Sequence, residues 1–335
     1  MRKPIRRLPL FLLACIIVTV LFTGCSGNNA AGKPDEPGET EKPQFIKNET
    51  ESQITVIDPL GDEVTLDKKP QRVVILMNSI LDLWYMAGGT AIARVSGTEN
   101  VPPEAEDIAD LGSVGSPNIE RIIALQPDLV IMTSTMQAHR DLKDVFGQNK
   151  IPYLYVNYMV YDDFIDYLDL FTRMTGREDI FKTSIADISN RVKDIIDRVS
   201  GQKKPRVLIL FSTAKSVQCE LPTGLDGDMV NMLGAENIVS DASVGDATRV
   251  EFSMERIVER DPDIILIATM GDVEKCKERI KEDIESNQAW AGLRAVKEGN
   301  IHYLPKDLFI YKPNARYPEA IEYLAKILYP GVNFE

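Results

Sequence analysis

Residues 118–132 read Asn-Ile-Glu-Arg-Ile-Ile-Ala-Leu-Gln-Pro-Asp-Leu-Val-Ile-Met, and residues 253–267 read Ser-Met-Glu-Arg-Ile-Val-Glu-Arg-Asp-Pro-Asp-Ile-Ile-Leu-Ile. The two stretches align without a gap and share a glutamate, an arginine, an isoleucine, a proline and an aspartate. Each pattern predicts one helix, a Pro-Asp turn and one buried strand. Solenoid repeats recur every ~20–50 residues, so two copies this far apart predict two similar lobes instead.

The same alternation of helix and strand surrounds both copies. Strands are expected at residues 72–76, 93–96, 129–132 and 153–156, and again at 206–211, 263–268 and 301–304. Helices are expected at residues 80–87, 163–174, 224–233 and 318–328, and a hairpin at 54–66. Because the strands are continuous apolar runs, they should be buried on both faces, as in parallel α/β sheets.

A different pattern separates the two halves. Residues 178–199 have apolar side chains at three- and four-residue spacing and contain no proline or glycine. This spacing predicts one long helix. The expected fold is therefore α/β, with two Rossmann-like lobes joined by one long, rigid interdomain helix and a ligand cleft between the lobes.

The N-terminus has the layout of an export signal. Basic side chains between Arg2 and Arg7 precede a short apolar run at residues 8–22, where a membrane span needs ~20 apolar residues. The sequence Leu21-Phe-Thr-Gly-Cys25 resembles the lipobox of bacterial lipoproteins, although phenylalanine stands where leucine is usual. That resemblance implies that Cys25 becomes the lipid-modified first residue. An ordinary cleaved signal that contains a cysteine is the alternative.

Polar and small side chains dominate residues 26–53, which predicts a flexible spacer. The formal charge is −13, and cleavage before Cys25 would remove four positive and no negative charges, leaving −17. Such a chain lacks the basic surface that nucleic acid requires. The expected organisation is a signal peptide at 1–24, a lipidated cysteine and flexible linker at 25–53, an N-terminal lobe at 54–176, an interdomain helix at 177–201 and a C-terminal lobe at 202–335.

Several stretches of the body carry a family resemblance. They are Thr55-Val-Ile-Asp58 with Val64-Thr-Leu66, Pro70-Gln-Arg-Val-Val-Ile75, Gly112-Ser-Val-Gly-Ser-Pro-Asn-Ile-Glu120, Pro127-Asp-Leu-Val130 with Pro262-Asp-Ile-Ile265, and Ala289-Trp-Ala-Gly-Leu293. Together they resemble the iron-siderophore, haem and cobalamin class of ABC-importer substrate-binding proteins. The resemblance implies modest closure of the lobes on a ligand.

The resemblance also assigns a role to Glu120 and Glu255, which would each meet arginines of the permease dimer. Two carboxylates at a fixed separation suit bidentate recognition by arginine. With Asn118 and Ser253 as N-caps, both glutamates would be the second helical residue. There they would also complement the helix dipole, a structural role worth ~0.3–1 kcal/mol.

Ligands of α/β proteins bind at the carboxyl ends of the strands. The candidate contacts are Asn78, Ser79, Tyr158, Tyr161, Gln218, Arg249, Phe309, Tyr311, Lys312 and Arg316. Their aromatic faces and cationic groups suit an anionic, partly apolar iron chelate or tetrapyrrole. The alternative is that the aromatic residues only pack and that Lys312 is merely solvated.

Two histidines are too few for a bare-metal cage, so no metal site and no resident cofactor are expected. His139 is expected at the surface, with haem ligation as the alternative, and His302 should be structural within a strand. Cys219 and Cys276 could pair in an exported protein or be buried free thiols.

No motif of hydrolases, zinc proteases or nucleotide-binding loops occurs, so an enzyme is not expected. The sequence instead predicts an importer's substrate-binding lipoprotein, held by its lipid alone at the outer face of the cytoplasmic membrane. It would deliver a ferric siderophore, haem or cobalamin-like ligand to a permease dimer with ATPase subunits. The alternative is a surface lipoprotein that scavenges such ligands without a permease.

Overall fold

A computed structural model describes residues 43–242, 245, 247–251 and 253–334. The expected signal peptide, Cys25 and most of the expected linker lie outside these residues. Within the described part, no helix combines the length and the apolar character needed to span a bilayer.

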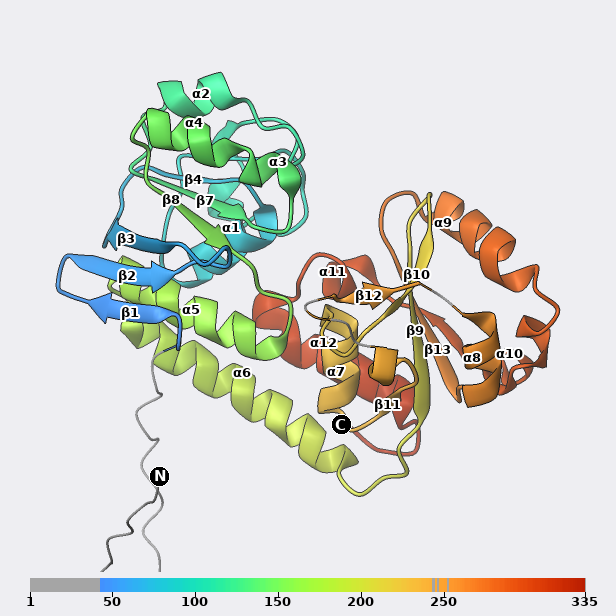
Figure 1. Ribbon diagram of the computed structural model, residues 1–335. Helices are drawn as coiled ribbons and strands as arrows, with labels where there is room; N and C mark the ends of the chain where they lie inside the picture. Colours follow the sequence, from blue (N-terminus) through green and yellow to red (C-terminus); the bar gives the residue numbers. More distant parts are fainter. Residues whose placement is uncertain (1–42, 243–244, 246, 252, 335) are drawn as a thin grey trace, which may run out of the picture. The chain divides into compact units, whose positions relative to one another are not determined.

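The N-terminal lobe is built on a parallel sheet with the strand order β6-β5-β4-β7-β8. Its strands are β4 (Val73–Ile75), β5 (Ala93–Arg94), β6 (Ala109–Asp110), β7 (Leu129–Thr133) and β8 (Tyr153–Val156). Its helices are α1 (Asn78–Met86), α2 (Ile119–Ala124), α3 (Gln137–Arg140), α4 (Leu142–Gln148) and α5 (Tyr161–Thr175). Figure 1 shows α2, α3 and α4 together on one side of this sheet and α5 on the other.

The C-terminal lobe has a mixed sheet with the order β12-β10-β9-β13-β14, and β11 pairs with the start of β9. Its strands are β9 (Arg206–Ser212), β10 (Val217–Glu220), β11 (Glu236–Asn237), β12 (Arg249–Val250), β13 (Ile264–Thr269) and β14 (Ile301–Tyr303). Its helices are α7 (Leu225–Met232), α8 (Met254–Arg260), α9 (Val273–Ile280), α10 (Arg294–Glu298), α11 (Lys306–Phe309) and α12 (Tyr317–Leu328). The expected α/β class and the expected helix–turn–strand repeat are confirmed.

The ordered body begins earlier than the sequence predicted. A small antiparallel sheet contains β1 (Ile46–Glu49), β2 (Gln53–Ile57) and β3 (Glu63–Asp67), so the expected hairpin gains a strand from the expected linker. Phe45 stacks on Tyr167 with 5.2 Å between the ring centroids. Two neighbouring apolar side chains, Phe45 and Ile46, pack against the core, which offsets the ordering of an otherwise polar stretch.

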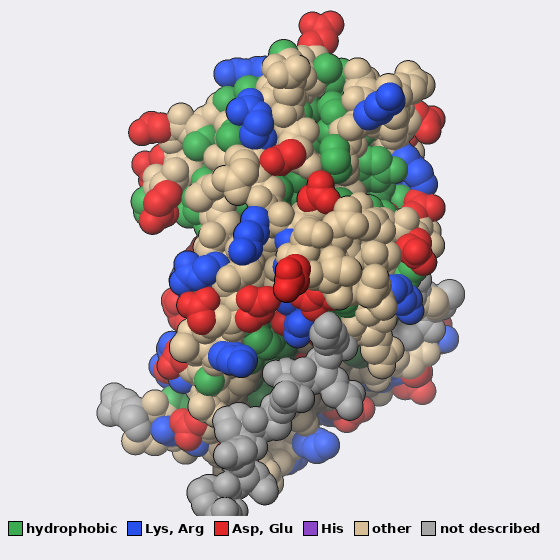
Figure 2. All heavy atoms as spheres, turned by 90° about the vertical axis from the view of Figure 1, so that its left-hand side faces the viewer, with side chains coloured by type: hydrophobic (Ala, Val, Ile, Leu, Met, Phe, Trp, Pro, Cys, Tyr) green, Lys and Arg blue, Asp and Glu red, His purple; other side chains and the backbone are tan. Residues whose placement is uncertain are grey.

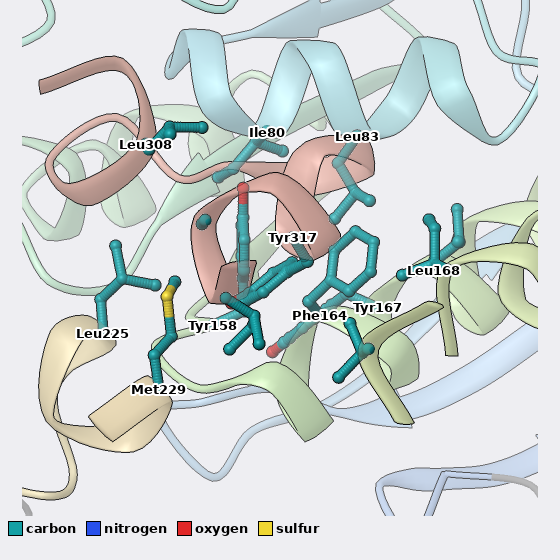
Figure 3. Close-up of a cluster of buried hydrophobic side chains, with 14 of the residues drawn as sticks. Ile80, Leu83, Tyr158, Phe164, Tyr167, Leu168, Leu225, Met229, Leu308 and Tyr317 are labelled. Atoms are coloured by element: carbon teal, nitrogen blue, oxygen red, sulfur yellow. The ribbon is translucent and has the colours of Figure 1, made fainter. Parts of the chain in front are cut away.

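One apolar cluster spans both lobes. Alternate strand residues face opposite sides of a sheet, and in both lobes one set points into this shared cluster: Val73 and Ile75 from β4, and Val207 and Ile209 from β9. The other sets fill two separate outer clusters, each within a single lobe. Figure 3 shows the shared cluster, where Tyr158 and Phe164 meet Leu225, Met229 and Tyr317.

The helix α6 (Glu178–Val199) lies between the two sheets in the sequence and has the bounds that the apolar spacing predicted. It buries Phe181, Ile188, Val192, Ile195 and Val199, and it packs against both α5 and α12. The connection between the lobes therefore also includes α5, α12 and the shared core. The rigidity of the connection stays a prediction.

Candidate functional site

The two glutamates of the repeat occupy equivalent positions. Glu120 is the second residue of α2 and Glu255 is the second residue of α8, and both side chains are exposed. Their predicted helical position is confirmed. The N-caps differ, because Asn118 accepts a hydrogen bond from the Arg121 N–H at 2.9 Å whereas the Ser253 side chain caps nothing.

Each Pro-Asp turn attaches its helix to the start of a neighbouring strand. The Asp128 carboxylate accepts hydrogen bonds from the backbone N–H groups of Gln71, at 2.7 Å, and Arg72, at 2.9 Å. The Asp263 carboxylate accepts one from the backbone N–H of Arg206 at 2.8 Å. Because these strands are buried within the sheets, both glutamates stand on firmly anchored helices.

Three of the ligand candidates meet at the boundary between the lobes. The Tyr158 hydroxyl lies 3.0 Å from the Ser79 carbonyl oxygen and 3.0 Å from Oδ1 of Asn314. The Lys312 ammonium lies 5.3 Å from the centre of the Tyr158 ring. All of these side chains are buried, so in this structure they join the lobes to one another. Burial raises the pKa of Tyr158, which therefore stays a neutral hydrogen-bonding group.

A second group lies on one face of the C-terminal sheet. Gln218 pairs with Phe211, and Glu220 pairs with Arg249, so alternate residues of β10 bring all four to the same face. The Arg249 guanidinium lies 3.5 Å above the Phe211 ring, and its Nε is 3.4 Å from a carboxylate oxygen of Glu220. Gln218 and Arg249 were expected in loops, but they lie on the short strands β10 and β12 and are half-buried.

Other candidates take structural roles. The Tyr161 hydroxyl lies 3.1 Å from the Ser189 hydroxyl, and its ring meets Tyr317 edge to face. Phe309 is buried against Tyr323. The exposed Arg316 pairs with Asp307 and Glu319.

The remaining two candidates lie close to the boundary. Asn78 begins α1 and reaches the Ser96 carbonyl at 3.5 Å, while its Oδ1 is buried and has no partner within the described part of the chain. The backbone carbonyl of Tyr311 accepts a hydrogen bond from the Asn100 side chain at 2.5 Å.

Two acidic residues and one amide of this region were not predicted. Glu220 and Asp226 are almost fully buried in the C-terminal lobe, and Asn314 is fully buried at the boundary. Glu220 ends the run Val217-Gln-Cys-Glu220, which gave only a weak indication of a buried charged site. A carboxylate is seldom buried without a cation, so its burial was not expected from the sequence. No local pattern marked Asp226, and none marked Asn314, whose partners lie far away in the sequence.

The expectation that His139 lies at the surface was wrong. Its ring is fully buried, with Nε2 2.8 Å from the Val114 carbonyl and Nδ1 accepting from the Thr133 N–H at 3.2 Å. Desolvation lowers its pKa, so the ring is neutral and Nε2 donates to the carbonyl. The short helix α3 places the ring against β7, where the ring bonds to the Thr133 N–H and to the Val114 carbonyl.

His302 lies in β14, as predicted. Cys219 and Cys276 are both free and buried, so the open question of a disulfide between them is answered. Burial raises the pKa of Cys219 to about 12, which makes it an unreactive thiol. The described residues contain no cluster of three or more metal-binding side chains.

Comparison with known proteins agrees with this architecture. A family model described as periplasmic binding protein matches residues 73–308. The chain belongs to the periplasmic binding protein family. The family consists of binding proteins, and two of the relatives are named as substrate-binding lipoproteins of ABC transporters.

Two relatives from Bacillus subtilis match over most of their length. The chain is 26% identical to the Fe(3+)-citrate-binding protein YfmC over 91% of this chain and 90% of that protein. It is 25% identical to the ABC transporter substrate-binding lipoprotein YvrC, which is described as uncharacterized, over 95% and 96%.

A solved structure confirms the fold. The structure of Staphylococcus aureus IsdE complexed with heme superposes with a TM-score of 0.68 at 20% identity, covering 77% of this chain and 98% of that one.

Proposed function

We propose that this protein is the substrate-binding lipoprotein of an ABC importer and has no catalytic role. The observation that carries the proposal is the pair of exposed glutamates at equivalent positions of the two lobes, each on a helix anchored to a buried strand. Arginines of a two-subunit permease can bind a two-lobed body that carries one carboxylate on each lobe. The helix dipole alone does not require glutamate at both sites, since aspartate would complement it equally well.

The proposed location is the outer face of the cytoplasmic membrane, with a lipid on Cys25 as the anchor. The relatives named as lipoproteins support this location. A tether raises the local concentration of loaded protein at its permease. A single acyl chain binds membranes only weakly, so we expect at least two chains on the cysteine.

The proposed cargo is an anionic iron chelate or a tetrapyrrole. Relatives named for ferric citrate, vitamin B12 and heme uptake support this class. Arg249, stacked on Phe211 and half-buried, is the best placed cation to receive an anionic group of the ligand. Among the described residues, its two terminal nitrogens have no hydrogen-bond partner.

The experiment separates ligand binding from docking. The absorption spectrum of the purified lipoprotein first identifies the class, because haem, corrin and ferric siderophores have different visible bands. Uptake of that ligand is then measured in cells with Glu120→Ala and Glu255→Ala, singly and together. We expect uptake to fall at least ~10-fold in the double variant, with ligand affinity unchanged.

Glu104→Ala with Glu298→Ala is the matched control, since each replaces an exposed glutamate, one in each lobe. Unchanged uptake in the docking double variant would contradict the proposed coupling. It would favour a scavenging lipoprotein that serves no permease.

A further inference from the structure

One short segment of the C-terminal chain is bound to the N-terminal lobe. The Asn100 side chain donates hydrogen bonds to the carbonyls of Tyr311, at 2.5 Å, and Lys312, at 2.9 Å. The Asn314 side chain donates to the Ser79 carbonyl at 3.0 Å and to Asp82 at 2.7 Å. We call residues 311–314 the clasp. Because of these hydrogen bonds, the clasp should move with the N-terminal lobe when the lobes separate.

The clasp carries a lysine into the boundary between the lobes. Lys312 is 9% exposed. Among the described residues its ammonium has two long hydrogen-bond contacts, at 3.5 Å to the Met159 carbonyl and 3.6 Å to the Met159 sulfur, and it lies over the Tyr158 ring. Among the described residues, no carboxylate lies within ion-pair distance of it. The backbone of Lys312 is left-handed, with φ of 61°, so the segment is held in a conformation that non-glycine residues seldom adopt.

Five charged groups act on this ammonium from four elements. Glu220 on β10, Asp226 and Asp228 on α7 and Asp163 on α5 favour its charged form, and Arg249 on β12 opposes it. Glu220 is already occupied, because one of its oxygens accepts from the Asp226 backbone N–H at 2.8 Å and the other lies near Arg249. It therefore offers little further compensation to the lysine.

Asp226 is the matching feature on the other side of the boundary. Its side chain is 1% exposed, and neither carboxyl oxygen has a hydrogen-bond partner among the described residues. A buried charged group without a partner weakens the conformation that buries it. The boundary thus holds an unpaired acid on the C-terminal lobe and a poorly paired base on the clasp.

We propose that Lys312 and Asp226 form a charge switch at the lobe boundary. Both groups are buried, so charging either one alone works against the buried arrangement, and separation of the lobes hydrates them. The switch is a property of the chain itself and does not depend on which ligand is carried. A ligand that holds the lobes together has to offset the free-energy cost of burying these two groups.

The direction of the pKa values agrees with the switch. Burial lowers the pKa of Lys312 to about 8, and burial with the nearby Glu220 raises the pKa of Asp226. A hydrated lysine has a pKa near 10.5, so the separated lobes bind more protons between about pH 8 and 10.5. Through Lys312, raising the pH across this window should therefore favour the buried arrangement. Asp226 acts in the opposite direction, because its buried carboxyl group holds a proton that the separated lobes release as the pH rises above the ordinary pKa of 3.8.

One amide reports directly on the boundary. The Tyr161 N–H, at the start of α5, donates to the Asp228 carboxylate on α7 at 2.8 Å. Its hydrogen exchange measures separation of the lobes, after correction for the intrinsic rate at each pH. The experiment uses the full-length lipoprotein in detergent micelles without added ligand, at about pH 7 and about pH 9.5.

Three versions of position 312 give three different patterns. In the wild type, protection of the Tyr161 amide should rise on the order of tenfold between the two pH values. Lys312→Met should be protected at both pH values, because it carries no charge. Lys312→Arg should be poorly protected at both, because its charge persists. Lys275→Met, an exposed lysine on α9, should behave as wild type.

Two results would overturn the proposal. One is exchange in Lys312→Met that equals or exceeds that of the wild type at about pH 7. The other is the same pH response in all three versions. If methionine packs badly and the variant unfolds, Lys312→Gln replaces it, with the same expected pattern. Since no ligand or permease is present, failure here leaves the test of the glutamates unaffected.

Discussion

The two copies of the helix–turn–strand repeat carry the same glutamate at the same helical position but hold their helices by different means. In the first copy, an Asn118 cap and two backbone hydrogen bonds to Asp128 attach α2. In the second, α8 has no side-chain cap, and Arg294 of α10 instead joins Asp261, at 3.1 Å, and Asp263, at 2.7 Å. Both copies share the hydrogen bond from the aspartate to the start of a strand. Both also have an arginine at that strand start, Arg72 or Arg206, that donates to a carbonyl at the end of the helix, so the two connections together position the glutamate.

The backbone before each proline also matches. Gln126 and Asp261 both have positive φ, at 47° and 39°, although neither is glycine. A strained residue persists where the surrounding structure determines it. Here the turn has to reverse the chain between an exposed helix and a buried strand. Only the second copy places a carboxylate at this residue, which is why only the second copy attracts Arg294.

The largest expected effect comes from breaking the common aspartate bond. Asp263→Ala should lower the free energy of unfolding by about 2–3 kcal/mol, since it leaves the Arg206 N–H without its acceptor and removes one of the two carboxylates paired with Arg294. Asp128→Ala should lower it by about 1 kcal/mol, because Asp128 is exposed and water can replace it. Urea denaturation of both variants measures the difference. Equal losses would show that the two turns are energetically alike.

A smaller effect tests the feature that only the second copy has. Arg294→Ala should cost about 1 kcal/mol, because its ion pairs with Asp261 and Asp263 are partly exposed to solvent. Combined with Asp263→Ala, the loss should be less than the sum of the two, since both remove one shared interaction. Arg256→Ala, an exposed arginine of α8, is the control and should be neutral. Full additivity would argue against the shared interaction.

The smallest effect distinguishes the caps. Asn118→Ala should cost about 0.5–1 kcal/mol, because it removes the hydrogen bond to the Arg121 N–H. Ser253→Ala should change stability by less than about 0.3 kcal/mol, because its side chain caps nothing. Thermal unfolding of the two variants side by side checks this order. A larger loss from Ser253→Ala would mean that the serine does cap α8 in solution.

Local patterns predicted the regular elements well. The helix at 178–199, the paired strands of the hairpin and both copies of the repeat follow from spacing, turn residues and apolar runs. The very short strands β6, β11 and β12 were not predicted, since two residues carry no periodicity. For the same reason Arg249 was expected in a loop.

The candidate site was only partly predictable. Placing residues at the carboxyl ends of strands picked out Ser79, Tyr158 and Lys312, which do meet. It could not pick out Asn100 or Asn314, because each interacts with residues more than 150 positions away in the sequence. Nothing near Asp226 indicated that its carboxyl group would be buried without a partner.

The sequence by itself determined the class of fold, the duplication and the helical position of Glu120 and Glu255. These depend on side-chain periodicity and on residues adjacent in the chain, so they can be read locally. Only the tertiary structure decided that one core spans both lobes, that His139 is buried and that Lys312 is buried near Asp226. Those features arise where distant segments exclude water together, and desolvation by a distant segment has no local signature in the sequence.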